Sequence, residues 1–311
     1  MINSISGYAS FKPTFKQNLH PVDVKYKNAI IKGIQDKFQF SPKLKDLDSV
    51  MGPFEFKELL KKLKPQNFSL GKIAYGNTVT LEDFENINTG LHCVNLHIHT
   101  KSSDGSMSVE EYLQQANNYG NKLKKLNNTN SLPYYIGSIT DHNNINGVQD
   151  AVARIADESI TYKNLKFITG CEFMFLDKDC GFKYPAFEAL GYCFNPFDKE
   201  LQNSLSKFIS INLIEKIKEF GGILSYAHPI RYCQGNGTNP KFIDYLKKIG
   251  IDGIESNYQY LTFKTDKELL NMINGIKKIA VKNGFWETGG TDSHCSNIFH
   301  HKAQKFLDEL I

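Results

Sequence analysis

The sequence lacks the features that mark several classes of protein. It contains no apolar run of about 18 residues, the length that a membrane helix needs, and residues 1–17 lack the apolar core of a secretory signal. Its six cysteines show no regular spacing and no CxxC pair, which argues against a zinc ribbon or a disulfide framework. We therefore expect a soluble, cytoplasmic protein with no membrane partner.

The sequence also has little excess charge. It holds 37 Lys and Arg against 33 Asp and Glu, a net charge of +4 over 311 residues. The lysines are scattered along the chain apart from short clusters, so the composition does not indicate a surface built for nucleic acid. No shorter internal repeat is visible. The length suits one large domain, with or without an extension.

Residues 1–90 differ from the rest of the chain. They are rich in Lys, Asn and Phe, are punctuated by proline, and contain two predicted helices, at 22–37 and 53–64. They carry no cluster of His, Asp and Glu of the kind that binds metal. We expect an accessory N-terminal extension that packs on the main domain or on a protein partner, with residues 91–311 forming the main domain.

From residue 91 onward, short apolar runs alternate with helical patterns. The predicted strands are 94–98, 134–139, 167–171, 186–194, 223–226, 253–255 and a strand that starts at 285–286. The predicted helices are 108–119, 145–157, 199–220, 239–248, 265–283 and 299–310, with a polar loop at 121–131. This alternation predicts parallel βαβ units, and hence an α/β sheet or barrel.

Two histidines lie one residue apart on the first of these strands. Side chains two positions apart point to the same side of a strand, so His97 and His99 can converge on one point while Leu96 and Ile98 pack behind them. This arrangement presents two imidazoles to one metal ion. A pair of hydrogen-bonded core histidines is the alternative interpretation for this stretch alone.

The later strands settle that choice, because most of them end in a residue that can bind metal. In α/β barrels the carboxyl ends of the strands meet at one face, so residues far apart in the sequence converge there. Imidazoles and carboxylates are the side chains that first-row transition metals prefer. The sequence therefore predicts a metal site built from His97, His99, Asp104, His142, Glu172, His228, Asp292 and His294.

These motifs, in this order, resemble those of the PHP (polymerase and histidinol phosphatase) superfamily of metal-dependent phosphoesterases. HIH at 97–99 is followed by SDG, TDH, a Glu after a Gly, AHP and a terminal DSH, over residues 93–296. The spacing and the sequence AHPIRY are similar to those of the small phosphoesterases, including nucleoside 3′,5′-bisphosphate phosphatases. The resemblance implies a distorted (β/α)7 barrel that holds two or three divalent ions at its mouth, Mn, Fe or Zn, with Mg as a further option.

The resemblance also assigns the residues to metals. Glu172 would bridge the first and second metals, and His228 would bind the second. The first metal would take His97, His99, Glu172 and Asp292, and the third would take Asp104, His142 and His294. The chain departs from the family at Glu188, where a histidine is often found. Either this carboxylate is a harder ligand that favours Mn or Fe over Zn, or it points away and the second metal binds more weakly.

The implied reaction is hydrolysis of small phosphomonoesters or nucleotide phosphates by a metal-bridging hydroxide that attacks phosphorus. Arg231 is the expected contact for the substrate phosphate, with a surface salt bridge as the alternative. His228 or His294 would serve as the general acid, unless a metal-bound water does so. We expect Asp141, beside His142, to orient imidazoles as a hydrogen-bond acceptor.

Two other functions compete with this one. The first is a 3′–5′ exonuclease like the polymerase-associated members of the superfamily, which would need a basic groove with aromatic side chains. The low net charge argues mildly against it. The second is a non-catalytic metal-binding regulator that uses residues 1–90 to bind a partner, and the near-complete ligand set argues against a loss of activity.

Overall fold

The computed structural model describes residues 19–63, 94–125, 134–230, 237–258, 266–296 and 298. The helices are α1 (Pro21–Phe38), η1 (Leu44–Leu47), α2 (Pro53–Lys62), α4 (Val109–Lys125), α5 (Asn146–Asp157), α6 (Lys199–Ser204), η4 (Ile211–Leu213), α7 (Ile214–Ile217), α8 (Pro240–Lys248) and α9 (Asp266–Asn283). The strands are β1 (Val94–Asn95), β2 (Tyr135–Ile139), β3 (Leu165–Leu176), β4 (Ala186–Tyr192), β5 (Ile209–Ser210), β6 (Ile223–Tyr226), β7 (Gly253–Tyr258) and β8 (Trp286–Gly290).

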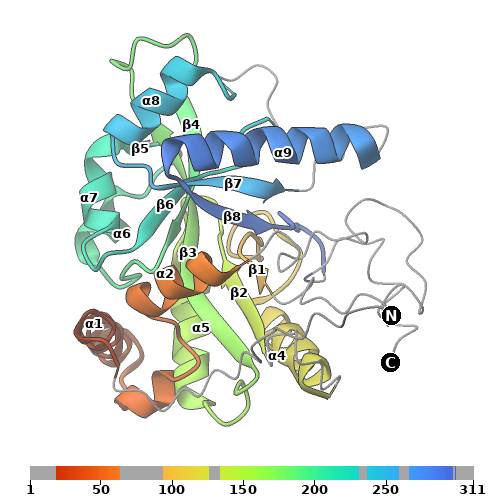
Figure 1. Cartoon of the computed structure of the whole chain (residues 1–311). Helices are drawn as coiled ribbons and strands as arrows, with labels where there is room; N and C mark the ends of the chain where they lie inside the picture. The colour runs from red at the N-terminus through yellow and green to blue at the C-terminus, as the bar shows by residue number, and fades with distance from the viewer. Residues whose placement is uncertain are drawn as a thin grey trace, which may run out of the picture.

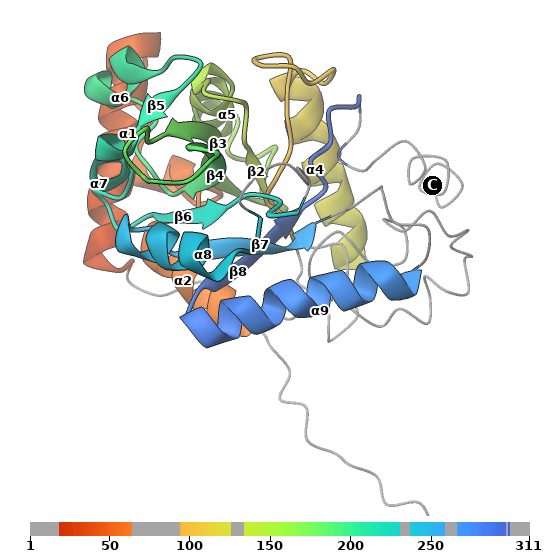
Figure 2. The ribbon, with the colours of Figure 1, turned by 90° about the horizontal axis from the view of Figure 1, so that it is seen from above.

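Seven of the strands form a nearly closed barrel in the order β1-β2-β3-β4-β6-β7-β8. Backbone hydrogen bonds join its two ends: the Leu96 N–H donates to the Gly289 carbonyl at 3.1 Å, and the His99 N–H donates to the Ser293 carbonyl at 3.0 Å. β5 lies off this path and pairs with β3. Seen from above, the helices lie outside the strands (Figure 2). The predicted distorted (β/α) barrel is confirmed.

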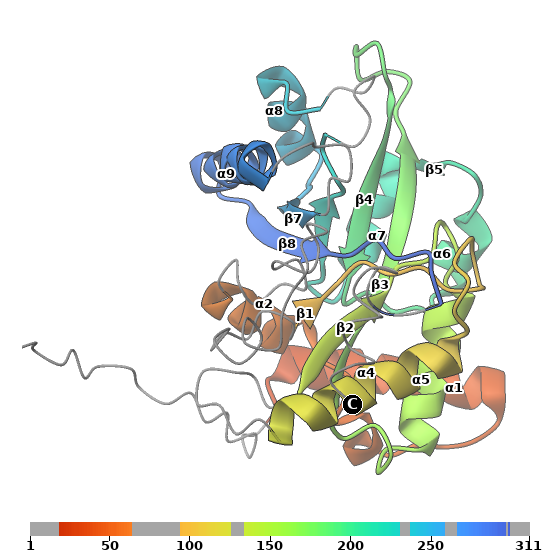
Figure 3. The same cartoon turned by 90° about the vertical axis from the view of Figure 1, so that its right-hand side faces the viewer.

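The expected run of parallel strands breaks at β4, which is antiparallel to both β3 and β6. The connection between β3 and β4 spans only residues 177–185, whereas a parallel crossover needs about a dozen residues or more. The chain therefore turns back on itself, and the pair extends beyond the rest of the sheet (Figure 3). This antiparallel pair is the main distortion of the barrel.

The predicted long helix over residues 199–220 is wrong. That stretch forms α6, then β5, η4 and α7. Ile209 pairs with Phe175, so the open edge of β3 recruits the segment as a short strand. In addition, the Asn143 side chain donates to the carbonyls of Ser206 and Lys207 at 2.6 and 2.8 Å, oxygens that a continuous helix would use for its own hydrogen bonds. Tertiary contacts thus override an apolar pattern of helical period.

The predicted helix at 108–119 is confirmed at its start and is longer than expected. The Glu111 N–H donates to Ser108 Oγ at 3.2 Å and the Ser108 N–H donates to Glu111 Oε2 at 2.6 Å, which is a capping box. The helix continues to Lys125, into the residues expected to form a loop. The polar residues of 121–125 are good enough helix formers to extend an existing helix.

The described part of the N-terminal region packs directly on the barrel. The Tyr26 hydroxyl lies 2.7 Å from Thr169 Oγ1, and Val50 pairs with Phe167 as an isolated bridge beside β3. Asp23 accepts hydrogen bonds from the first backbone N–H groups of α2, a cap supplied from another helix. Tyr26 and Val50 belong to the same hydrophobic core as the barrel residues.

Figure 1 shows α8 and α9 on one side of the strands and α1, α2, α4 and α5 on the other. The expected domain boundary at residue 90 and the expected helix at 299–310 both lie outside the described residues. Among the described residues, no helix is both long and apolar enough to cross a membrane.

Candidate metal centre

His97 and His99 leave the barrel at the point where β1 meets β8. Both side chains are fully buried, and their Nε2 atoms lie 3.2 Å apart, so they face the same point. The segment that carries His97 passes close to the end of β8 at Gly290. Only a glycine fits there, because a Cβ at this position would collide with the backbone of His97. The alternation expected for a strand therefore holds, although regular strand geometry ends at Asn95.

Two carboxylates complete what we call the inner cluster, His97, His99, Glu172 and Asp292. Glu172 Oε2 lies 3.2 and 3.3 Å from the Nε2 atoms of the two histidines. Asp292 Oδ1 lies 3.3 and 3.0 Å from the same two atoms. The four side chains are at most 3% exposed.

Glu172 lies at the centre of the site. It stands within β3 and not at its end, because the antiparallel pairing with β4 carries the strand on to Leu176. Its Oε2 atom lies 3.1 Å from His142 Nδ1, while its Oε1 atom lies 2.9 Å from His228 Nε2. One carboxylate thus presents its two oxygens to different sets of histidines.

Glu188 points toward the same centre. It is 7% exposed, and its Oε2 atom lies 3.5 Å from His228 Nε2. β4 places it there because Glu188 pairs with Met174, two positions along β3 from Glu172, on the same face of the hairpin. His142, Glu172 and Glu188 form a second group of ligand atoms that could hold an ion.

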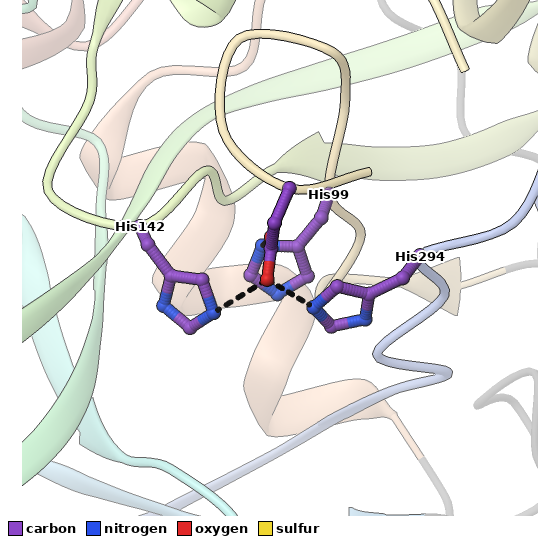
Figure 4. Close-up of side chains that lie close together, drawn as sticks. His99, His142 and His294 are labelled. Carbon is purple, nitrogen blue, oxygen red and sulfur yellow. Dashed lines mark ion pairs between the residues drawn. The ribbon is translucent and has the colours of Figure 1, made fainter. Parts of the chain in front are cut away.

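A more exposed group, which we call the outer cluster, consists of His99, Asp104, His142 and His294. Figure 4 shows its three imidazoles close together, and the ring centroid of His99 lies 4.4 Å from that of His142 and 4.1 Å from that of His294. Asp104 Oδ2 lies 3.3 Å from His294 Nε2 and 3.8 Å from His142 Nε2. The side chains of Asp104, His142 and His294 are 57%, 32% and 28% exposed. The two clusters share His99.

Backbone strain marks the turns that present these groups. Asn143, His228 and Asp292 have positive φ angles of 43°, 22° and 50°, which side-chain-bearing residues rarely adopt. His228 and Asp292 are themselves candidate ligands, and Asn143 directly follows the candidate ligand His142. Such conformations persist only where surrounding contacts impose them, as is common at functional sites.

The electrostatics of the metal-free site reflect crowded carboxylates and imidazoles. Burial alone would lower the pKa of His97, but the charges of Glu255, Asp292 and Glu172 outweigh it and raise that pKa well above its usual value. Burial would also lower the pKa of His99. Hydrogen bonds to Asp292 and Glu172 outweigh the effect of burial and raise this pKa to about 9. Burial would raise the pKa values of Glu172 and Asp292. The histidines His97 and His99 outweigh burial and hold both pKa values well below the usual range.

His142 behaves differently from the inner histidines. Burial lowers its pKa, and the attraction of the Glu172 carboxylate only partly offsets this effect. A neutral imidazole is the form that binds metal. In the metal-free protein the shift of His142 thus favours its neutral, metal-binding form, whereas the shifts of His97 and His99 favour their charged forms.

The residues present fit divalent metal ions. Imidazoles and carboxylates together suit Mn, Fe or Zn. The Nε2 atoms of His97 and His99 and two carboxylate oxygens converge on one point, with nitrogen–oxygen and nitrogen–nitrogen distances of 3.0–3.3 Å, so that a cation could replace the protons now shared among them. His99 Nδ1 is buried and has no hydrogen-bond partner among the described residues. These clusters could hold metal ions.

Some expectations about individual residues change. Asp141 does not orient an imidazole: its carboxylate accepts from the Thr100 N–H at 2.7 Å, from Thr100 Oγ1 at 2.8 Å and from Ser103 Oγ at 2.7 Å. It therefore holds the turn that carries Asp104 through hydrogen bonds from a segment about 40 residues away in the sequence. Arg231 lies outside the described residues.

Sequence reasoning missed two residues of β7 that contact the inner cluster. Glu255 Oε1 lies 3.0 Å from His97 Nδ1, and the Tyr258 hydroxyl donates to Asp292 Oδ2 at 2.8 Å. Neither residue belongs to one of the sequence motifs. Each contacts the atom of a predicted ligand that faces away from the centre of the inner cluster. The available signal was the position of Glu255 at the carboxyl end of the predicted strand 253–255, where the other strands carry ligands.

The fold is similar to that of two solved structures. An amidohydrolase from Chromobacterium violaceum, solved with sulfate and without metal, matches with a TM-score of 0.50 and 15% identity, over 65% of this chain and 88% of that chain. A protein from Bifidobacterium adolescentis, described as a candidate metal-dependent phosphoesterase, has a TM-score of 0.46 and 16% identity, over 69% and 95%. No protein-family profile and no curated protein matches the sequence. At such identities the first similarity supports the fold alone.

Proposed function

We propose that the chain is a metal-dependent hydrolase of phosphate esters, with small phosphomonoesters or nucleotide phosphates as substrates. The position of Glu172 carries this proposal. Its two oxygens face different histidines at 2.9–3.3 Å, so one carboxylate can be shared between neighbouring cations. When bound, such cations supply a hydroxide at neutral pH and neutralise charge on a phosphoryl group.

The inner and outer clusters would have different roles in this reaction. The inner cluster is closed to solvent, so its imidazoles and carboxylates hold fixed positions in a dry environment. The outer cluster opens to solvent, and a substrate would enter from that side. Mixed imidazole and carboxylate ligands, with Glu188 in place of a histidine, favour Mn or Fe over Zn.

Proton transfer to the leaving group is better served by His294 than by His228. His228 is 1% exposed and its Nε2 atom faces the carboxylates of Glu172 and Glu188. His294 is 28% exposed, and its Nδ1 atom lies 3.0 Å from the Asp292 carbonyl, which orients Nε2 toward Asp104 and the open side. A general acid must reach the leaving group, so of the two we assign this role to His294, which fills it only while its Nε2 atom carries a proton and binds no metal.

Arg231 remains our proposed contact for the substrate phosphate, on the basis of its position three residues after His228. A guanidinium binds phosphate through two parallel hydrogen bonds and keeps its charge. Arg231→Ala should raise KM or lower kcat/KM for phosphoesters while metal content stays unchanged. Unaltered kinetics would remove Arg231 from the site.

The proposal is tested by metal analysis of the purified protein combined with a substrate panel in Mn, Zn and Mg. The panel holds p-nitrophenyl phosphate, AMP, nucleoside 3′,5′-bisphosphates, histidinol phosphate, short oligonucleotides and an amide substrate. We expect turnover of one or more small phosphoesters. Two or more bound metals without turnover of any phosphoester would contradict the proposal, and cleavage of oligonucleotides alone would favour the exonuclease.

A further inference from the structure

β7 contributes none of the candidate metal ligands, yet two of its side chains face the centre. Its pairing with β8 is irregular: Glu255 pairs with Thr288, but Asn257, two residues on, pairs with Gly289. On a regular strand, residues 255 and 258 would point to opposite faces. The β-bulge at Ser256 removes this conflict and aims both Glu255 and Tyr258 at the inner cluster.

Glu255 uses both carboxylate oxygens. Oε1 lies 3.0 Å from His97 Nδ1, and Oε2 accepts a hydrogen bond from the backbone N–H of His228 at 2.9 Å. The carboxylate is fully buried. Because an ionised carboxylate only accepts hydrogen bonds, it requires a proton on His97 Nδ1 and so leaves the Nε2 lone pair for the centre.

The second contact of Glu255 acts on the backbone. His228 has a φ of 22°, outside the regions that side-chain-bearing residues favour. A hydrogen bond from its own N–H to a buried carboxylate fixes the turn in this conformation. The imidazole of His228 is thereby held with Nε2 toward Glu172 and Glu188.

Tyr258 acts on a third ligand in the same manner. Its hydroxyl donates to Asp292 Oδ2 at 2.8 Å, while Asp292 Oδ1 faces the Nε2 atoms of His97 and His99. The hydroxyl therefore selects which carboxylate oxygen faces the centre.

We propose that β7 is the positioning strand of the metal centre: Glu255 sets the tautomer of His97 and the turn at His228, and Tyr258 sets the orientation of Asp292. This inference rests on the metal-binding part of the proposed function and does not depend on the substrate. One strand thus holds His97, His228 and Asp292, which follow three other strands. The bulge in β7 makes this possible because it aims both Glu255 and Tyr258 at the inner cluster. Partners of this kind typically change metal affinity by about 10- to 100-fold when removed.

Glu255→Gln is the sharpest test, because it keeps size and shape but supplies one acceptor where the carboxylate supplies two. The amide oxygen must stay with the His228 N–H, which can only donate. The amide NH2 then faces His97 Nδ1, and a proton moves to Nε2, the atom needed by the metal. We expect binding of Zn or Mn to weaken by about 10- to 100-fold, measured by competition with a chelator.

Glu287→Gln is the matched control. Glu287 lies on the neighbouring strand β8, and its carboxylate accepts from Ser256 Oγ at 2.6 Å, away from the centre. Its variant should bind metal within about twofold of wild type. Tyr258→Phe is a milder second variant that keeps the ring, and we expect a severalfold loss of metal affinity that spares the His97 tautomer.

A readout that a merely structural role would not move is the tautomer itself. Long-range 1H–15N spectra, recorded at a Zn concentration that saturates wild type but not the weaker-binding Glu255→Gln, should show the proton of His97 on Nδ1 in wild type and in Glu287→Gln, and on Nε2 in Glu255→Gln. Metal affinity and tautomer unchanged in Glu255→Gln would overturn the proposal, as would a wild type that binds no divalent metal. A wild type that binds metal but cleaves no phosphoester would contradict only the proposed function.

Should Glu255→Gln fail to fold, Tyr258→Phe decides the matter by the same competition assay. Metal affinity equal to that of wild type in Tyr258→Phe would then contradict the positioning role of β7, and a severalfold loss would support it.

Discussion

The inner and outer clusters share His99 but are built in opposite ways. The inner cluster is formed by residues at and within strands, is at most 3% exposed, and is held from behind by Glu255 and Tyr258. The outer cluster depends on Asp104, which stands on a turn and is 57% exposed. A buried, hydrogen-bonded ligand set keeps its geometry without metal, whereas an exposed carboxylate must be ordered when the ion binds.

This difference predicts that ions bound in the two clusters differ in affinity and in rate of exchange. An ion in the inner cluster should bind tightly and exchange slowly, because its ligands lose little conformational freedom on binding. An ion in the outer cluster should bind more weakly and exchange readily, since the Asp104 side chain is 57% exposed and its charge is screened. The outer ion would then be the one that a substrate meets first.

The largest expected effect comes from breaking the inner cluster. His97→Ala should remove metal from the inner cluster and abolish activity, with a loss beyond the roughly 10- to 100-fold typical of residues behind the ligands. Metal analysis and phosphoester turnover check this result. His20→Ala, which removes a histidine at the start of α1, is the control and should keep both metal and activity. Full activity in His97→Ala would contradict the assignment of the site.

Asp104→Asn should have a smaller and more selective effect. It should weaken binding of one ion while the inner ion stays, because Asp104 contacts His99 through Nδ1 at 3.7 Å and not through the Nε2 atom that faces the inner cluster. The free energy of unfolding should change by less than about 0.5 kcal/mol, as expected for an exposed side chain on a turn. Stepwise metal titration and thermal unfolding check both points. Loss of all bound metal in this variant would show that the two clusters are not separable.

Graded treatment with a chelator sharpens the comparison without any substitution. The outer ion should leave first, and activity should fall before the inner ion is removed. Aliquots taken over time would be measured for metal content per chain and for turnover. Simultaneous loss of all ions would contradict the contrast between a preformed and an exposed cluster.

The smallest expected effect is a pH dependence of the metal-free protein. The pKa of His99 is raised from 6.5 to about 9, so its contribution to stability is complete below pH 6.5 and is lost as the pH rises through about 9. Glu172 and Asp292, whose pKa values are lowered, stabilise above their ordinary values and lose that contribution in acid. Urea unfolding of the metal-free protein between pH 6 and 9.5 should therefore show falling stability. Stability that is flat or rising over this range would contradict the buried charge network.

The residues at strand ends were predictable because chemistry and periodicity agree there. His97 and His99 alternate on a strand, and turns with small residues carry His228 and Asp292. Parallel strands converge at one face, so the sequence order alone indicates that these residues meet. The barrel itself follows from the same alternation.

The remaining features depend on contacts between distant segments. The antiparallel course of β4 follows from a connection too short for a crossover, and the break in the predicted helix at 199–220 follows from pairing of Ile209 with β3. Glu255 reaches His97 only because a bulge re-aims β7. Apolar periodicity carries no information about bulges or about which edge a segment joins, so these features could not be read from it.

The central claim is that Glu172 lies between cations on its two sides. Crystals of the Mn-loaded protein, measured for anomalous scattering at the Mn edge, test it most directly. We predict at least two peaks, one beside Glu172 Oε2 among His97, His99 and Asp292, and one beside Oε1 near His228. A single peak remote from Glu172, or no peak at full Mn loading, would contradict the claim.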